Sequence, residues 1–314
     1  MPERNKIAIA AAFTALCVIW SSTWLAIKVG LEDLPPLSFA ALRFAIAIVA
    51  LFAFSMATRV RLLPQRREDY TLLAVTGAIM FALNYGLLFW GELHVSSGLA
   101  AVLQSTIPMF GMIFAHWLLP AEPLRWQRMV GALVATSGVA LICGRLLDRG
   151  GVLAFWAGLG ILVGAAGASL SNVLLKRRAL QLAPAMIAAW QMIFGLIPLL
   201  ALGLVFEGNP VGFHWTGKAV FCLLYLAIIG SALTFLLLYW LLPQMGSTDL
   251  QTIALITPPG AVGFGWLLGG ETFSLSHLFG AALVLAGVWM IFRKLDRRDA
   301  AEAPASLKIE MPRG

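Results

Sequence analysis

The chain has 314 residues, of which 60% are hydrophobic and 12% are charged, and its formal net charge is +7. An average soluble domain carries about twice this share of charged residues, so the composition argues against a soluble protein. A basic excess in so apolar a chain indicates cytoplasmic loops rather than nucleic-acid binding. Three cysteines, Cys17, Cys143 and Cys222, lie inside apolar stretches and have no disulfide or metal-site spacing. We therefore expect no metal, no cofactor and no nucleic-acid partner.

Ten apolar stretches follow one another along the chain, each about as long as a membrane-spanning helix requires. The first is too long for the core of a signal peptide and lacks a small-residue cleavage site, so we expect it to be retained as a helix. The polar end of the chain, residues 295–314, is expected to be a disordered cytoplasmic tail. The sequence predicts an all-α integral membrane protein with spans at 7–29, 37–58, 70–90, 97–119, 126–146, 155–177, 185–206, 216–240, 247–268 and 275–294.

The positions of the basic residues predict the orientation. If the N-terminus is cytoplasmic, seventeen of the 22 Lys and Arg residues fall in inside segments. Cytoplasmic loops of membrane proteins are enriched in these residues. We expect a protein of the bacterial inner membrane with both termini in the cytoplasm.

The two halves of the chain repeat each other at a shift near 149 residues. Matches of Leu, Val and Ala arise by chance in apolar sequence, so the comparison depends on rarer residues. The aligned pairs include Trp90 with Trp240, Pro108 with Pro258, Trp117 with Trp266, and Glu122 with Glu271. Each unit, 7–147 and 152–294, would hold five helices, an odd number that inverts the second unit in the membrane. Inverted repeats are typical of carriers with alternating access, although a duplicated scaffold is also compatible with a structural role.

Several segments resemble the EamA-type proteins of the drug/metabolite transporter superfamily. The segments are Ile19 to Leu31, Leu34 to Pro36, Ala41 to Phe44, Ser97 to Ala101 with Pro108, Gly270-Glu271, and Gly280 to Val288. The similarity extends over residues 7 to 294. It implies ten helices, two inverted repeats and export of small metabolites such as amino acids. The chain departs from the family at Pro120 to Pro123, where a Gly-Glu pair is usual, and this affects only the expected shape of that loop.

Prolines near the middle of spans four and nine are candidate breaks. Proline removes an amide donor and frees the carbonyl four residues earlier, which in span four belongs to Gln104. Interruptions at corresponding positions of two repeats point to the transport site, and a pair of kinks that only shape packing is the alternative. We expect helix breaks with a gating role at Pro108, Pro258 and Pro259.

Polar and aromatic side chains within the spans are candidate substrate-binding residues. Polar side chains in spans usually face the bundle interior, and hydrogen bonding between helices is the alternative role. Trp20 and Trp24 are four residues apart on one helix face, and an aromatic wall for an amphipathic solute or simple core packing would explain them. The candidates are Trp20, Trp24, Asn84, Tyr85 and Gln104 in the first repeat, and Ser169, Asn172, Tyr239 and Gln251 in the second.

Charged residues near the spans have structural interpretations. We expect Lys28 and Lys218 to extend toward the membrane surface, and Arg43 to pair with Glu32 or Asp33. Glu92 is assigned to a short connector. Because no carboxylate is expected at mid-membrane, the sequence indicates facilitated movement and leaves the coupling to protons or ions open.

The sequence therefore predicts a transporter and not an enzyme. Common catalytic and nucleotide-binding motifs are absent from the sequence. A membrane-embedded enzyme acting on lipid-like substrates, or a channel, is the alternative. The expected partners are a small-molecule solute and membrane lipid, and the oligomeric state is left open, with a monomer possible.

Overall fold

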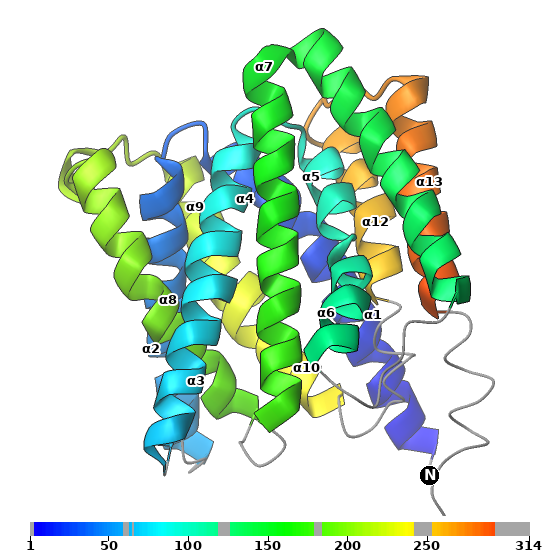
Figure 1. The fold of residues 1–314 in the computed structure, drawn as a ribbon. Coiled ribbons are helices and arrows are strands. Elements are labelled where there is room, and N and C mark those ends of the chain that lie inside the picture. Colours follow the sequence, from blue (N-terminus) through cyan, green and yellow to red (C-terminus); the bar gives the residue numbers. More distant parts are fainter. Residues whose placement is uncertain are drawn as a thin grey trace, which may run out of the picture.

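The computed structural model describes residues 3–58, 63–64, 66–118, 126–178, 184–241 and 253–292. These residues form helices and connecting turns, and no strand occurs among them (Figure 1). The elements of the first half are α1 (Glu3–Gly30), α2 (Pro36–Thr58), α3 (Arg67–Gly77), η1 (Ala78–Asn84), α4 (Tyr85–Glu92), α5 (Ser97–Gln104) and α6 (Ile107–Leu118). They are followed by α7 (Trp126–Arg178), α8 (Pro184–Phe206), η2 (Pro210–Gly212), α9 (Gly217–Leu224), η3 (Tyr225–Leu233), α10 (Thr234–Leu241), α12 (Ile253–Leu267) and α13 (Leu275–Phe292).

Seven helical stretches of the described chain are long and apolar enough to cross a membrane, by length and composition. They are Ile7–Gly30, Pro36–Thr58, Arg67–Glu92, Ser97–Leu118, Gly151–Leu175, Ala185–Phe206 and Gly217–Leu238. Two shorter apolar helices, Met129–Gly144 and Leu275–Met290, fall where the sequence predicts further spans. The all-helical membrane architecture is thus confirmed, and the count of ten inverted spans stays a prediction.

The long α7 consists of two helices that meet at Gly151. This residue has φ +76° and ψ −175°, a left-handed backbone that glycine adopts without the steric cost of a Cβ atom. The two parts of α7 descend on either side of the turn, one in the centre of the view and the other beside α13 (Figure 1). The turn lies at the boundary between the two halves of the chain.

Two membrane helices contain a π-helical segment, in which each turn holds an extra residue. The segments are η1 in the third span and η3 in the eighth predicted span. Residues 78–84 shifted by 149 become 227–233, which lie within η3. The irregularity therefore recurs at matching positions of the predicted repeats. Such segments are rare and frequently occur at functional sites.

Aromatic side chains and small residues hold the bundle together. Phe39, Phe44, Phe81 and Phe89 are almost completely buried, and Phe44 meets Phe81 edge-to-face with ring centroids 4.9 Å apart. At the junction of α7 and α13 the backbones approach closely, because a Cβ atom on Gly138 would lie 2.6 Å from the carbonyl oxygen of Gly280. Small residues permit this close approach of membrane helices.

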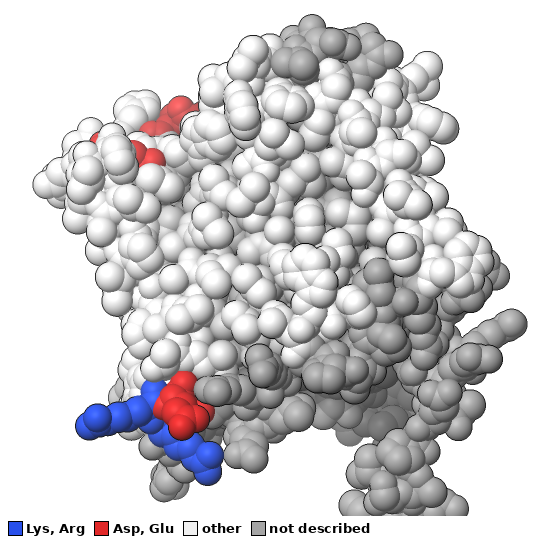
Figure 2. Space-filling model, viewed as in Figure 1, with Lys and Arg blue, Asp and Glu red and all other residues white. Residues whose placement is uncertain are grey.

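The charges that Figure 2 shows gather at two ends of the face in view. One group lies at the lower end, where α3 begins with Arg67, Glu68 and Asp69. The visible described surface between the two ends is uncharged (Figure 2). A wide uncharged belt with charged ends is what a lipid bilayer requires of a protein that crosses it.

Candidate functional site

Asn84 and Gln104 meet inside the bundle. The Gln104 Nε2 donates a hydrogen bond to the Asn84 Oδ1 at 2.6 Å, and both side chains are buried. Asn84 ends the π segment η1, and Gln104 is the last residue of α5. The backbone of α7 closes over them, because a Cβ atom on Gly164 would lie 2.9 Å from the Asn84 Oδ1. Two expected binding residues are thus neighbours, each at an irregularity of its helix.

The break after Gln104 separates α5 from α6. Ser105 and Thr106 form the turn, and Pro108 is the second residue of α6. The hydroxyls of the turn bond to the end of α5, since Ser105 and Thr106 donate to the carbonyls of Val102 and Leu103, each at 2.6 Å. In the other repeat α12 continues through Pro258 and Pro259 without interruption. The three prolines therefore have unlike surroundings in this structure.

Arg43 connects the two π segments. Its Nε donates to the Ser231 Oγ at 2.9 Å and its Nη2 to the Gly230 carbonyl at 3.3 Å, both in η3. On the other side the guanidinium lies over the ring of Tyr85, 5.3 Å from its centroid, directly after η1. Arg43 is 3% exposed, and its Nη1 has no hydrogen-bond partner among the described residues.

The expectation that Arg43 pairs with Glu32 or Asp33 is wrong, because Lys218 contacts these carboxylates. The Lys218 Nζ lies 2.5 Å from the Glu32 Oε2 and 3.4 Å from the Asp33 Oδ2. The Thr216 hydroxyl also donates to Asp33 at 2.6 Å. This hydrogen bond, with smaller effects of His214 and Lys218, lowers the pKa of Asp33 against the opposing effect of desolvation. The loops before α2 and α9 are thereby joined.

Glu92 is not in a connector, as the sequence suggested, but forms the last residue of α4 and is completely buried. Neither of its carboxylate oxygens has a hydrogen-bond partner among the described residues. The Lys28 ammonium donates instead to the backbone carbonyls of Glu92 and Val95. Lys28 therefore satisfies the end of α4 rather than extending to the membrane surface, and the favourable position of a cation at a helix C-terminus explains this.

Trp20 and Trp24 are half-buried on α1, but they pack against different clusters. Trp20 packs against buried residues of α1, α10 and α12, whereas Trp24 packs against the core around α4, α5 and α13. Between them, the Ser22 hydroxyl lies 2.5 Å from the Tyr225 hydroxyl at the start of η3. Thus α1 also contacts a π segment.

The expected residues of the second repeat are less closely grouped. Ser169 is buried, and a Cβ atom on Gly111 of α6 would lie 3.1 Å from its Oγ. Asn172 is exposed on the surface of α7. Tyr239 lies in α10, where only its backbone is described, and Gln251 lies outside the described residues. Of this group, the described contacts bring only Ser169 into the core.

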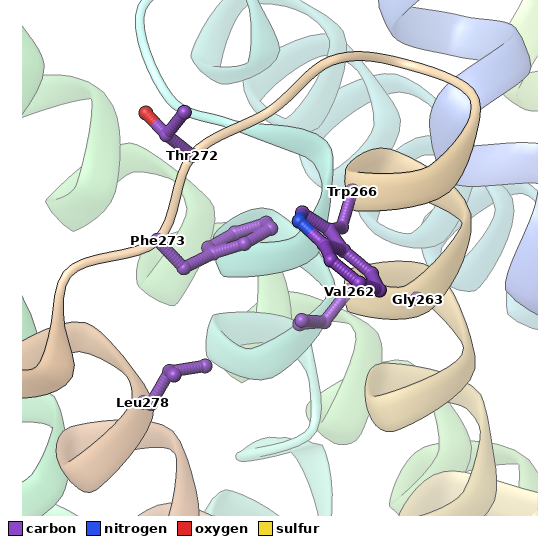
Figure 3. Close-up of a pocket in the computed structure, with 6 residues that line it drawn as sticks. All are labelled: Val262, Gly263, Trp266, Thr272, Phe273 and Leu278. Carbon is purple, nitrogen blue, oxygen red and sulfur yellow. The ribbon is translucent and has the colours of Figure 1, made fainter.

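An open hollow of about 390 Å³ lies between α12 and α13 (Figure 3). The Trp266 and Phe273 rings extend toward it from α12 and from the loop before α13 (Figure 3). Its lining residues are Val262, Gly263, Trp266, Thr272, Phe273 and Leu278. None of the expected substrate-binding residues is among them. The hollow is therefore separate from the group of expected substrate-binding residues.

Sequence reasoning missed Arg43, Ser231 and Glu92. Arg43 lies within predicted span two and Glu92 two residues after predicted span three, so a charge inside or at the edge of an apolar stretch could have indicated them. Ser231 gives no such signal, because a hydroxyl in an apolar helix usually bonds to its own backbone. The π segments have no evident sequence pattern.

Comparison with known proteins identifies the family. The EamA-like transporter family matches residues 6–144 and again residues 155–293. The uncharacterized transporter YoaV of Bacillus subtilis is 29% identical over 285 residues, which cover 90% of this chain and 96% of YoaV. The uncharacterized inner membrane transporter YedA of Escherichia coli is 27% identical, with 93% of this chain and 92% of YedA covered.

A third relative has a more specific name. It is a probable terminal-alkyne amino-acid exporter of Streptantibioticus cattleyicolor, 30% identical over 297 residues that cover 93% of this chain and 96% of the relative. A solved crystal structure with 18% sequence identity has the same fold, with a TM-score of 0.65 over 93% of this chain and 99% of its own. The chain is a multi-span membrane protein and belongs to the EamA-like transporter family.

Proposed function

We propose that the protein exports amino acids or related zwitterionic, partly apolar solutes across the bacterial inner membrane. The single observation that carries this proposal is the position of Arg43 between the two π segments, with the unpaired Nη1 of a buried guanidinium. A guanidinium is the preferred partner of a carboxylate. The amino-acid exporter named among the relatives agrees with such a substrate.

The transport site of this proposal lies where the π segments meet α1, α2 and α5. Asn84 and Gln104 offer amide groups on one side, and Ser22 with Tyr225 offers hydroxyls on another. The aromatic rings of Phe44, Tyr85 and Phe89 surround Arg43 and supply apolar surface. Such a site suits a solute that has charged and apolar parts.

Alternating access follows from the predicted repeats, 7–147 and 152–294, which would rock against each other. The family match to two successive segments of similar length and the matching π segments support this arrangement. Both termini and the tail 295–314 would be cytoplasmic. Accessibility labelling of single cysteines tests the scheme, because cysteines placed at the starts of the first and sixth helices must react from opposite sides.

Reconstitution tests the function. Liposomes that contain the protein should exchange labelled amino acid in a saturable counterflow, and Arg43→Gln should raise the KM for amino acids at least tenfold while leaving the KM of amines without a carboxylate unchanged. Linear flux that does not saturate would favour a channel. Absence of flux together with lipid turnover would favour an enzyme. An equal KM in the variant would remove Arg43 from the site.

A further inference from the structure

The carboxylate of Glu92 is buried near two cations, one buried and one partly buried, yet it forms no hydrogen bond with either. Lys28 from α1 and Arg43 from α2 are close enough for their charges to interact with it, as is Glu271 before α13. Besides α1 and α2, the described elements that pack against α4 are η1, α5 and the part of α7 after Gly151. They hold no acidic or basic residue between 78 and 84, between 151 and 175, or between 97 and 104.

Both neighbouring cations have other acceptors. The Lys28 ammonium donates to two backbone carbonyls, and two nitrogens of the Arg43 guanidinium donate to η3. Glu271 is also occupied, because its two oxygens accept from the Ser97 and Gly98 amides at 2.7 and 3.4 Å. An ionised carboxylate without hydrogen bonds is strongly disfavoured in an apolar interior. The arrangement therefore suits a carboxyl group that holds a proton.

Glu92 lies on the face of α4 that contacts Arg43. Tyr85, Phe89 and Glu92 are spaced by four and three residues, which places them along one side of a helix. The Arg43 guanidinium packs on the first two rings, at 5.3 and 5.9 Å from their centroids. The Glu92 carboxyl of α4 and the Arg43 guanidinium of α2, each with unpaired atoms, thus lie along the same face of α4. This is the charge pattern that the ammonium and carboxylate of an amino acid would require.

We propose that Glu92 exchanges a proton for the ammonium group of the solute, which makes the protein a proton antiporter; the assignment rests on the proposed function. With no solute bound, Glu92 is a neutral carboxylic acid, as its buried surroundings require. When an amino acid enters, the O–H bond of Glu92 breaks, the proton leaves to water, and the carboxylate pairs with the ammonium group. After release of the solute, Glu92 takes a proton from the opposite side and carries it back.

Two measurements test the exchange. Addition of amino acid to the purified protein in weak buffer should release protons, whereas Glu92→Gln should release none and Glu92→Asp should restore the release. In liposomes a pH gradient should accelerate wild-type transport at least tenfold and leave the Glu92→Gln rate unchanged. Glu207→Gln, which removes a carboxylate at an outer helix cap, should keep both responses. Equal proton release, or an equal response to the gradient, in wild type and Glu92→Gln would overturn the proposal.

A solute-independent readout separates this proposal from the proposed function. Infrared difference spectra recorded between low and high pH should contain the carbonyl band of a buried protonated carboxyl group, absent in Glu92→Gln and retained in Glu207→Gln. If the band is present but no amino acid is transported, the substrate assignment fails and the proton site stands. A band that is unchanged in Glu92→Gln would overturn the proton site, whatever the protein transports.

Discussion

Glu207 connects the end of α8 to the beginning of α2. Its Oε1 accepts a hydrogen bond from the Leu37 amide at 2.8 Å, and its Oε2 accepts one from the Ser38 amide at 2.7 Å. The first amides of a helix have no partner within the helix, so this carboxylate caps α2 although it is 170 residues away in sequence. We therefore expect Glu207→Gln to weaken the contact between the two halves.

The size of the effect follows from the two bonds. Hydrogen bonds to a charged group contribute about 1.5–3 kcal/mol each, and partial exposure of Glu207 places them at the lower end. Glutamine retains one acceptor oxygen but loses the charge, so the expected loss is about 1–2 kcal/mol. For proteins of about 150–250 residues this corresponds to a fall in Tm of roughly 2–8 °C.

Thermal unfolding in detergent, followed by near-ultraviolet circular dichroism, measures this loss. The control is Asp69→Asn, the same chemical change in the first turn of α3, for which loss of the favourable helix-dipole interaction predicts only about 0.3–1 kcal/mol. If Glu207→Gln melts at the temperature of wild type, or no lower than the control, the carboxylate does not support the contact between α8 and α2 and the reasoning is refuted.

Three further outcomes are expected. Gln104→Leu should leave Asn84 without its hydrogen bond and reduce transport at least tenfold with normal membrane insertion, and full activity would remove the pair from the site. Because its pKa in the folded protein is lowered, Asp33 stabilises the loop contact above its unfolded pKa of about 3.9, and this contribution disappears as pH falls through the folded value. Hence acid should loosen the wild-type loop, measured by hydrogen exchange, whereas Asp33→Asn should be loose at every pH. Gly138→Leu should lower the Tm by more than 5 °C, since the side chain would meet the backbone at Gly280, and an unchanged Tm would refute the close packing.

Hydropathy alone located most of the fold. The predicted spans at 7–29, 37–58 and 185–206 agree with the helices Ile7–Gly30, Pro36–Thr58 and Ala185–Phe206 within a residue or two. The length of an apolar stretch is a local property that the bilayer selects directly, which explains this success. The π segments could not be predicted, because their residues have no evident sequence pattern.

The site was predictable only in part. Asn84 and Gln104 could be selected as polar side chains within spans, but their burial and mutual hydrogen bond depend on how spans three and four pack. The partner of Arg43 was misassigned, because nearness in sequence favoured Glu32 and Asp33, which instead contact Lys218. Glu92 was missed because the polar residues after it resemble a loop.

The single left-handed residue between the two parts of α7 restricts how the protein can move. One residue spans at most about 3.6 Å, so neither half can travel far along the membrane normal at this end without unwinding a helix. A vertical, elevator-like displacement of one half against the other is therefore disfavoured, whereas a tilt that pivots on Gly151 changes the distance between the ends of the tether very little. If the two halves rock against each other as proposed, the turn would serve as the hinge, and the greatest excursions are expected at the end of the bundle farthest from it.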